Sequence, residues 1–412
     1  MKYDVAVIGG GAAGLCAAIC LKRSAPSLSV AVLEQLPRVG KKLITTGNGR
    51  CNITNRNPAL IRFHSENPDF AGFALKRYDN KAVEEFFKSI GIVITYDEIG
   101  RAYPYSLQAA SVVDMLRFAC DELSVQTLTN TKVTDIKKTQ NGFMLTTDNE
   151  NIQARAVLVA AGLYSGGEKL GSDGKILRIM RDKLGYKVVK TTPAIVQLKT
   201  PPQSVRSLKG MKVNANAALY NNGKLVREEY GEVLFCDYGL SGPPIMQLSR
   251  AVERSSGKFT VSLDIMPDYD FSALCDLLES RVNVLGKRTL EEFFTGMLNK
   301  RVGQYILKGC GFALSDDVLS VRKDIKRIAS AIKQMQFEIT GTTGFINSQV
   351  TAGGLDTHGF DNKTMMSLKH KGLFAAGEIL DIDGDCGGFN LQWAWASAMS
   401  AADGICKYLG VK

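Results

Sequence analysis

The chain has 412 residues, of which 45% are hydrophobic and 22% charged, and 51 Lys and Arg against 41 Asp and Glu give a formal net charge of +10. A chain of this length and average composition buries large cores in two or three domains, which excludes disordered, collagen-like and disulfide-scaffold proteins. The positive charge would suit an anionic ligand, a nucleic acid or a membrane surface.

Strands and helices alternate along the first 190 residues. Buried strands are predicted where short runs are uniformly apolar, at 5–8, 30–33 and 157–162, and helices at 12–22, 81–89 and 109–122. The opening order of strand, helix and strand is a βαβ unit. Alternating segments between 125 and 156, with a turn at Asn141-Gly142, predict a small antiparallel meander.

The pattern changes after about residue 191. Strand-like pieces over 194–264, broken by proline and Asn-Gly turns, predict a β-barrel or sandwich, and 271–334 is mainly helical in pattern. A further buried strand is predicted at 373–377, and a final helix runs from Gly388 to about residue 408. We therefore expect an α/β fold in which a Rossmann-like domain, residues 1–190 and 341–412, carries an inserted domain at 191–340.

A dinucleotide fingerprint fills the first strand-to-helix turn. In Gly9-x-Gly11-x-x-Gly14 the glycines allow a tight turn, close approach of a pyrophosphate and packing of the helix on the strand. The first N–H groups of the helix would hold the phosphates. Glu34 follows the second strand, where it would accept hydrogen bonds from an adenosine ribose and repel a 2′-phosphate. The pattern predicts FAD or NAD rather than NADP.

The cysteines, the histidines and the apolar segments exclude several classes of protein and site. The nine cysteines form no C-x-x-C pair and no apolar run reaches ~18 residues, so we expect a reduced, cytoplasmic protein without a membrane span. Asp4 and Gly9-Gly10-Gly11 interrupt the apolar start, which argues against an export signal. The three histidines show no ligand spacing, so neither a metal site nor a Ser-His-Asp triad is expected.

Two further segments bear on partners. The basic run at 322–327 is interpreted as one solvated helix face, with a nucleic-acid or partner site as the alternative. The glycines of 341–344 follow no convincing strand and are interpreted as a turn between domains. With one fingerprint in the chain, a two-site disulfide reductase is not expected, and a nicotinamide donor would bind only transiently.

Four glycine-rich segments carry a resemblance. They are Val39-Gly40-Lys41-Lys42-Leu43, the loop Thr45-Thr46-Gly47-Asn48-Gly49-Arg50-Cys51-Asn52-Ile53-Thr54-Asn55, Val350-Thr351-Ala352-Gly353-Gly354-Leu355, and Gly377-Glu378 with Asp385-Cys386-Gly387-Gly388-Phe389-Asn390-Leu391-Gln392. Together with Arg101-x-Tyr103-Pro104, Gly171-Ser172-Asp173-Gly174 and Gly239-Leu240-Ser241-Gly242-Pro243, they resemble the BaiN-type flavoproteins, also called the aminoacetone oxidase family of FAD-binding enzymes. The resemblance covers essentially the whole chain and implies FAD in a glutathione-reductase-type domain.

The resemblance also implies where FAD binds. The loop of Gly49 to Asn52 would lie along the isoalloxazine, and Glu378 would meet a ribitol or ribose hydroxyl. The start of the final helix would stabilise negative charge at flavin N1 and C2=O. The residues expected to bind FAD are Gly9, Gly11, Ala12, Ala13, Gly14, Glu34, Gln35, Lys41, Lys42, Gly49, Arg50, Cys51, Asn52, Val133, Ala161, Gly162, Gly377, Glu378, Asp385, Gly388, Phe389, Asn390 and Leu391.

Three functions follow as hypotheses. The first is reduction of a C=C bond conjugated to a carbonyl, as in a steroid or bile-acid enone, with electrons from NAD(P)H. In this reaction hydride would pass from flavin N5 to the β-carbon, and a tyrosine or water would protonate the α-carbon. The second is oxidation by O₂ of small amines such as aminoacetone. The third is an FAD-containing protein associated with RNA, although nucleic acid is an unlikely partner because no aromatic residues interleave the basic run.

The catalytic candidates are Arg50, Cys51, Tyr103, Tyr238 and Trp393. Cys51 has no partner cysteine nearby, so a packed or flavin-lining thiol is favoured over a redox one. A small-molecule substrate is expected, while its identity, the electron donor and the oligomeric state stay open.

Overall fold

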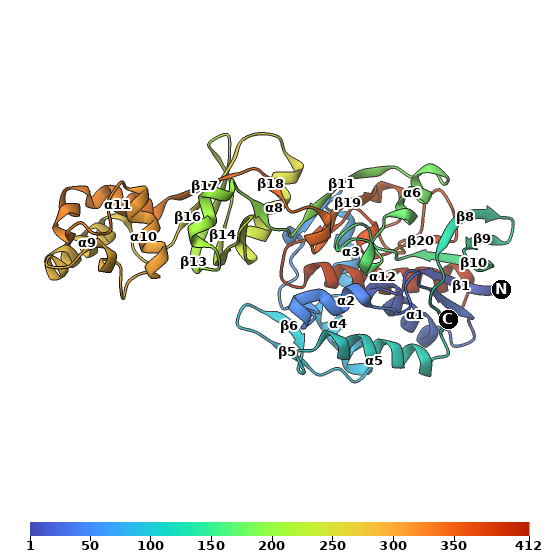
Figure 1. Ribbon diagram of the computed structural model, residues 1–412. Coiled ribbons are helices and arrows are strands. Elements are labelled where there is room, and N and C mark those ends of the chain that lie inside the picture. The colour runs from blue at the N-terminus through green and yellow to red at the C-terminus, as the bar shows by residue number, and fades with distance from the viewer. Residues whose placement is uncertain (412) are drawn as a thin grey trace. The chain divides into compact units, whose positions relative to one another are not determined.

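A computed structural model describes residues 1–411 of the chain (Figure 1). The fold divides into two compact units, the first formed by Met1–Pro193 and Phe345–Lys412 and the second by Ala194–Gly344. The chain therefore leaves the first unit once and returns to it once. The sequence-based boundaries of the insertion, 191 and 340, lie within a few residues of these crossings.

The first unit is built on a twisted sheet whose central strands are parallel and are buried over their carboxyl-terminal halves. Its order is β7-β2-β1-β10-β9-β8, and β20 also pairs with β10. The parallel strands are β1 (Lys2–Ile8), β2 (Val30–Leu33), β7 (Gln126–Leu128), β10 (Asn151–Val159) and β20 (Leu373–Ala375); the antiparallel pair is β8 (Val133–Thr139) and β9 (Gly142–Thr147). The uniformly apolar runs are strands buried on both faces, as expected for a parallel sheet.

One strand of this sheet serves three neighbours. Along one edge β10 pairs with β1; along the other its first half pairs with β9 and its last three residues pair with β20. The last segment of the predicted meander and the start of the predicted strand at 157–162 are thus one strand, which ends at Val159. Because β20 belongs to the returning segment, this pairing fixes the C-terminal part of the chain to the N-terminal core.

Helices cover the sheet and use small residues where they pack closely. α1 (Ala12–Ser24) and α12 (Phe389–Leu409) lie against each other and are mostly buried (Figure 1). The other helices of this unit are α2 (Lys41–Thr45), α3 (Phe70–Arg77), α4 (Asn80–Ser89), α5 (Ala109–Glu122) and α6 (Lys175–Asp182). The side chains of Trp393 and Trp395 fill the space beneath α12, and their indole N–H groups donate to Gly377 O at 3.1 Å and Ile53 O at 2.9 Å.

Three small sheets hold the loops at the carboxyl ends of the parallel strands. They are β3-β6-β5 (Thr54–Asn55, Arg101–Pro104 and Ile94–Tyr96), β4-β21 (Phe63–His64 and Asp383–Gly384) and β11-β19 (Val188–Ala194 and Val350–Leu355). Each joins segments that are distant in sequence or follow a glycine-rich loop. The carboxyl edge of a parallel sheet is where such folds bind ligands.

The second unit has a seven-stranded antiparallel sheet followed by helices. The sheet order is β17-β16-β13-β14-β15-β12-β18: Met335–Ile339, Phe259–Asp264, Lys212–Asn221, Lys224–Phe235, Gly239–Ser241, Leu198–Lys199 and Gly341–Thr342. Only Thr340 separates the two edge strands, so the sheet curls into a barrel-like form. The helices are α7 (Pro202–Val205), α8 (Pro243–Arg254), α9 (Phe271–Leu285), α10 (Lys300–Gly309) and α11 (Ile325–Lys333).

Two sequence-based interpretations in this unit are wrong in detail. The basic run does not lie on one helix, because a 3₁₀ segment, Val318–Asp324, holds Arg322 and Lys323 and α11 begins only at Ile325. The glycines after residue 340 do follow a strand, β17, and Gly341 and Thr342 form β18. In both cases barrel and helix packing decided the local structure, which a window of six residues does not reveal.

Candidate active site

The β1–α1 turn has the shape that the fingerprint predicts. Gly9 has φ +108°, and a Cβ on it would lie 2.5 Å from Ala160 O. A Cβ on Gly14 would lie 1.9 Å from Gly9 O, so α1 can approach the turn only with glycine there. Nothing lies within 4 Å of a Cβ built on Gly11. Within residues 1–411 the N–H groups of Ala12, Ala13 and Gly14 have no partner, so they are open to an anion.

Glu34 lies where the sequence predicts but already binds the protein. One carboxylate oxygen accepts from Gly10 N at 2.9 Å and the other from Leu36 N at 2.8 Å. Burial raises the pKa of this carboxyl, and the backbone hydrogen bonds oppose the rise. Each oxygen still has a second lone pair, so the carboxylate can accept a ribose hydroxyl while it fixes the turn.

A cleft extends from this turn along the ends of the strands. Of the residues expected to bind FAD, those at the cleft are Gly9, Glu34, Gln35, Val133, Ala161 and Gly162. Lys132 and Asp173 also line it and form an ion pair of 2.8 Å. Sequence reasoning missed this pair, although Asp173 belongs to the quoted Gly-Ser-Asp-Gly motif. Asp173 lies in a loop distant in sequence from Lys132, and only the fold brings this loop beside the start of β8.

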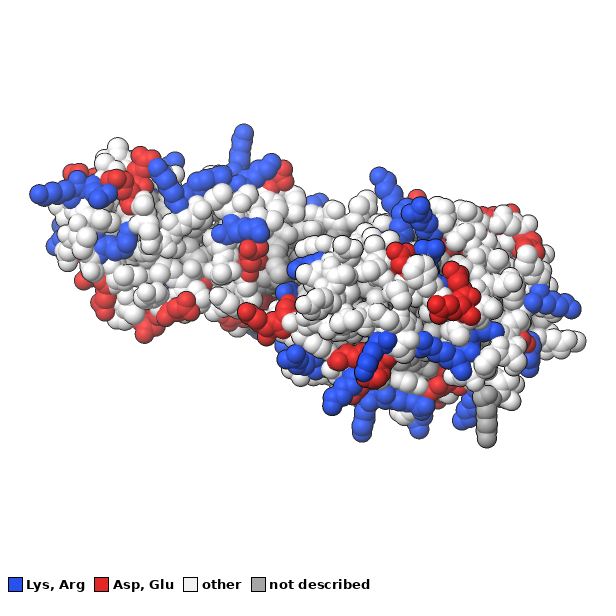
Figure 2. Space-filling view, turned by 90° about the horizontal axis from the view of Figure 1, so that it is seen from below, with Lys and Arg blue, Asp and Glu red and all other residues white. Residues whose placement is uncertain are grey.

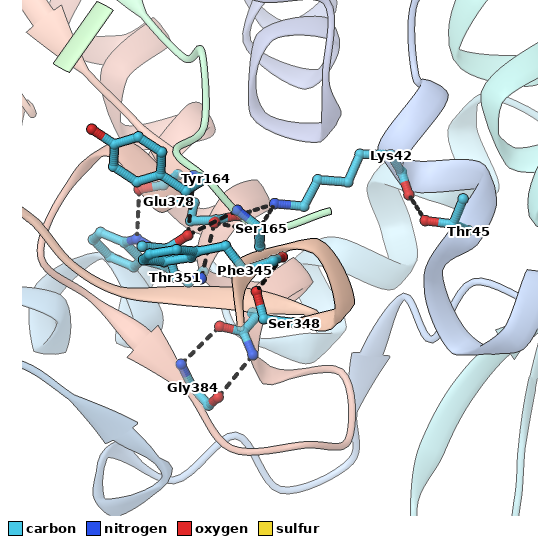
Figure 3. A network of polar contacts seen from close by, with 12 residues as sticks. Lys42, Thr45, Tyr164, Ser165, Phe345, Ser348, Thr351, Glu378 and Gly384 are labelled. Carbon is cyan, nitrogen blue, oxygen red and sulfur yellow. Dashed lines mark hydrogen bonds and ion pairs between the residues drawn. The ribbon is translucent and has the colours of Figure 1, made fainter. Parts of the chain in front are cut away.

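A polar network surrounds Glu378 (Figure 3). One oxygen of this carboxylate accepts from Ser165 Oγ at 2.7 Å and Thr351 N at 3.0 Å, and the other forms an ion pair with Lys42, whose ammonium also donates to Ser165. Thr351 Oγ1 accepts from Ser165 N at 3.0 Å. Three segments distant in the sequence are thus joined at one carboxylate. The neighbouring Lys41 is exposed and takes no part.

The predicted role of Glu378 in binding a hydroxyl of FAD therefore needs restating. Its two oxygens are occupied by protein donors, so any hydroxyl would be an additional partner. Lys42 has a third N–H that the network leaves unused. Ser165 is a site residue that the sequence gave no reason to select, whereas Thr351 lies in the quoted Val-Thr-Ala-Gly-Gly segment.

The loop expected along the isoalloxazine is bound to the start of α12. The Asn52 amide accepts from Gly388 N at 2.9 Å and donates to Thr54 O at 2.9 Å and Ala102 O at 3.2 Å. Of the residues at this helix start that were expected to bind FAD, Gly388 therefore already uses its N–H within the protein. In the described chain, the N–H groups of Phe389, Asn390 and Leu391 remain without partners.

Three carboxyl-terminal residues of the predicted set stabilise the segments that lead into α12. The Asn390 side chain bridges Gly384, accepting from its N–H and donating to its carbonyl, both at 2.8 Å. Asp385 is 5% exposed and binds His64 Nε2 at 2.8 Å and Arg62 at 3.3 Å. Gly377 N donates to Ser397 Oγ at 2.9 Å. These contacts position the helix start.

The catalytic candidates fall into different surroundings. Cys51 is fully buried, and burial raises its pKa to about 12, so its thiol stays protonated. Trp393 is a core residue. Tyr238 belongs to the second unit, where burial and the neighbouring Cys236 raise its pKa to about 12. Arg50 is exposed and lies over the ring of Tyr103, with 5.2 Å from Cζ to the ring centroid.

A family model, the HI0933-like protein Rossmann domain, matches residues 3–404. The chain belongs to this family. It is 34% identical over 404 residues to the 3-dehydro-bile acid delta(4,6)-reductase of Clostridium scindens, covering 96% of this chain and 97% of that protein. It is 27% identical to the ribosomal RNA dihydrouridine synthase of Haemophilus influenzae, over 97% and 98% of the two chains.

This HI0933-like protein also has fold relatives among solved structures. A quinol-fumarate reductase with menaquinol molecules aligns with a TM-score of 0.53 at 14% identity, covering 100% of this chain and 72% of that one. That likeness concerns the fold. Family and relatives together confirm the motif-based resemblance and an FAD-dependent oxidoreductase.

The site itself fits FAD. Among the described residues two helix starts offer unpartnered N–H groups, Gly11 leaves room for a pyrophosphate, and Glu34 lines the cleft at the position expected for an adenosine ribose. FAD when bound supplies hydride transfer at its N5. Among residues 1–411 no group of three or more His, Cys, Asp or Glu could hold a metal ion.

The expectations about a membrane span and about a nucleic-acid partner have different outcomes. Within residues 1–411 no helix is both long and apolar enough to cross a bilayer. The expectation that nucleic acid is no partner is not confirmed, because one relative is named for ribosomal RNA.

Proposed function

We propose that this HI0933-like protein reduces a carbon–carbon double bond conjugated to a carbonyl, with NAD(P)H as electron donor. The observation that carries the proposal is the 34% identity, over 96% of the chain, to a delta(4,6)-reductase acting on a 3-dehydro bile acid. Reduction adds hydride to the β-carbon and a proton to the α-carbon, so the product gains two hydrogens and the nicotinamide loses a hydride.

The second relative supports the same bond chemistry on another substrate. Uridine carries a double bond conjugated to its C4 carbonyl, as a steroid enone does, and dihydrouridine is its saturated form. One active site that polarises a carbonyl beside a double bond therefore suits both. The second candidate function, reduction of uridine in ribosomal RNA, is favoured by this relative and by the net charge of +10.

The distribution of charge favours the small-molecule substrate. On the face shown in Figure 2, Lys and Arg are spread over both parts of the chain instead of forming one stripe. Many Lys and Arg of the described chain are also paired with acids, as Lys212 is with Glu232 and Lys300 with Glu291, both at 2.9 Å. A surface of alternating sign attracts phosphate backbones less than a basic groove does.

The experiment starts with the flavin spectrum of the purified protein under anaerobic conditions. NADH and NADPH are each titrated in, and the reduced protein is then mixed with a steroid enone, with a ribosomal RNA transcript, or with air. Reoxidation by the enone with a saturated product supports the proposal. Reoxidation by RNA with dihydrouridine formed supports the second candidate. Peroxide release from aminoacetone without any nicotinamide would support an amine oxidase and contradict both.

A further inference from the structure

An unusual tyrosine lies beside the loop expected to contact the flavin ring. Tyr103 is only 5% exposed, yet within residues 1–411 no group hydrogen-bonds to its hydroxyl. The hydroxyl oxygen itself keeps some accessible surface. Buried tyrosines normally satisfy the O–H, because an unmade hydrogen bond costs free energy. A phenol that the described protein leaves free beside this loop can donate a hydrogen bond to an oxygen of a ligand.

The backbone around Tyr103 holds it in one place. It lies in β6, the central strand of the sheet β3-β6-β5, and pairs with Thr95. β3 continues directly from the loop of Gly49 to Asn52, and the Asn52 amide ties that loop to Ala102 O and Gly388 N. A Cβ on Gly47 would lie 3.6 Å from Tyr103 Cε1, so the ring packs under the loop.

Two guanidinium groups flank the ring. Arg50 Cζ lies 5.2 Å and Arg101 Cζ 6.0 Å from its centroid. Arg101 shares a face of β6 with Tyr103 because strand side chains alternate, and Asp97 partly neutralises it through an ion pair of 2.7 Å. Arg50 has no ion pair in the described chain; its Nε donates to Gly47 O at 3.3 Å. Two guanidinium groups therefore lie near the ring, and one of them, Arg101, is paired with a carboxylate.

We propose that Tyr103 donates a hydrogen bond to the carbonyl oxygen of the substrate, and that Arg50 and Arg101 stabilise the negative charge which forms on that oxygen. The inference rests on the proposed function. When hydride reaches the β-carbon, the π electrons of the double bond shift toward the carbonyl and leave an enolate oxygen. Tyr103 keeps its proton, and a proton from water then reaches the α-carbon.

The titration of the phenol agrees with a donor role. Burial raises the pKa of Tyr103, while the charges of Arg101 and Arg50 lower it and those of Asp97 and Cys386 raise it, with a net rise. A phenol with a raised pKa stays protonated at neutral pH and is a poor source of protons for carbon. It remains a hydrogen-bond donor to an oxygen that gains charge, the arrangement that stabilises such transition states.

The test compares Tyr103→Phe with Tyr105→Phe, a tyrosine two residues along that is 73% exposed. Because Tyr103→Phe removes a hydroxyl with no protein partner, it should fold with an unchanged Tm. We expect enone-driven reoxidation to slow about 100-fold, with reduction by NAD(P)H changed less than about twofold. Tyr105→Phe should behave as wild type.

A binding measurement gives a readout independent of turnover. 4-Nitrophenolate, whose absorbance reports its charge, mimics an enolate oxygen and can be titrated at mildly alkaline pH. Its Kd should rise about tenfold in Tyr103→Phe, equivalent to about 1.4 kcal/mol, and should also rise in Arg50→Met.

The outcomes separate the inference from the proposed function. Unchanged reoxidation and unchanged probe binding in Tyr103→Phe would overturn the role of Tyr103, as would slower reoxidation with unchanged probe binding. If the wild type reduces neither enone nor RNA but binds the probe through Tyr103, the reaction is wrong and the oxyanion site stands.

Discussion

The turn between β1 and α1 contains two glycines, Gly14 and Gly11, whose substitution by alanine should have different effects. At Gly14 a Cβ would lie 1.9 Å from Gly9 O, about 1.4 Å short of an ordinary carbon–oxygen contact. The opposing atom belongs to the backbone of a buried turn and cannot rotate away. At Gly11 no atom lies within 4 Å of a Cβ, and the backbone angles of φ −89° and ψ −166° suit alanine.

We expect Gly14→Ala to destabilise the protein itself. Forcing α1 from the turn should cost about 3 kcal/mol or more, at the upper end of overpacking substitutions. For a unit of this size that lowers Tm by roughly 6–12 °C without FAD. Gly11→Ala should leave Tm of the apoprotein almost unchanged, within about 0.5 kcal/mol of unfolding free energy.

The same methyl group at position 11 should act when FAD binds. It occupies the space that the pyrophosphate needs beside the unpartnered N–H groups of α1, so we expect affinity to fall by about 2–3 kcal/mol, or about 30- to 150-fold. Differential scanning fluorimetry of apoprotein and fluorescence titration with FAD measure the two effects. If Gly11→Ala binds FAD like wild type, or if both variants lower the apoprotein Tm equally, the division of roles is refuted.

The remaining predictions concern three polar groups. Lys42→Met should cost roughly 1–2 kcal/mol in urea unfolding, because it leaves the carboxylate of Glu378 mostly buried without its cation, and adding Glu378→Gln should recover part of the loss. Burial raises the pKa of Cys51 to about 12, so its thiol should resist alkylation by iodoacetamide in the folded protein. The flavin bound to Cys51→Ala should still be reduced, and so bleached, by NAD(P)H. Burial alone would raise the pKa of Asp173, but hydrogen bonds from Lys132 and the backbone hold this pKa below the usual value. The ionised carboxylate therefore stabilises the folded protein at neutral pH, and we expect Tm to lose this contribution below about pH 4. In Asp173→Asn this acid-dependent loss of Tm should be absent.

The fold was largely predictable because its main signals are local. Uniformly apolar runs of four residues mark strands buried on both faces, and the fingerprint glycines mark the turn between β1 and α1. These features depend on sterics within a few residues. The barrel-like form of the second unit follows from strand closure at Thr340, which no single segment encodes.

The site was predictable as a set of segments but not as a set of contacts. Gly377-Glu378 and Lys42 were both expected to bind FAD, yet nothing in the sequence indicates that they bind each other across 336 residues or that Ser165 joins them. Partners of this kind depend on where the parallel strands end in space. Tyr103 was one tyrosine among several until the structure showed a mostly buried side chain whose hydroxyl has no partner within residues 1–411.

These contacts bear on how FAD binds. The acids expected at its hydroxyls, Glu34 and Glu378, are each held by two or more protein donors, and Asn52 already joins the ring loop to the start of α12. Their orientations are therefore set before any cofactor arrives. A preorganised site loses little conformational entropy on binding, so more of the interaction energy appears as affinity. A substitution of Asn52 that removes these contacts should therefore weaken the binding of FAD, even though the Asn52 side-chain amide bonds only to the protein.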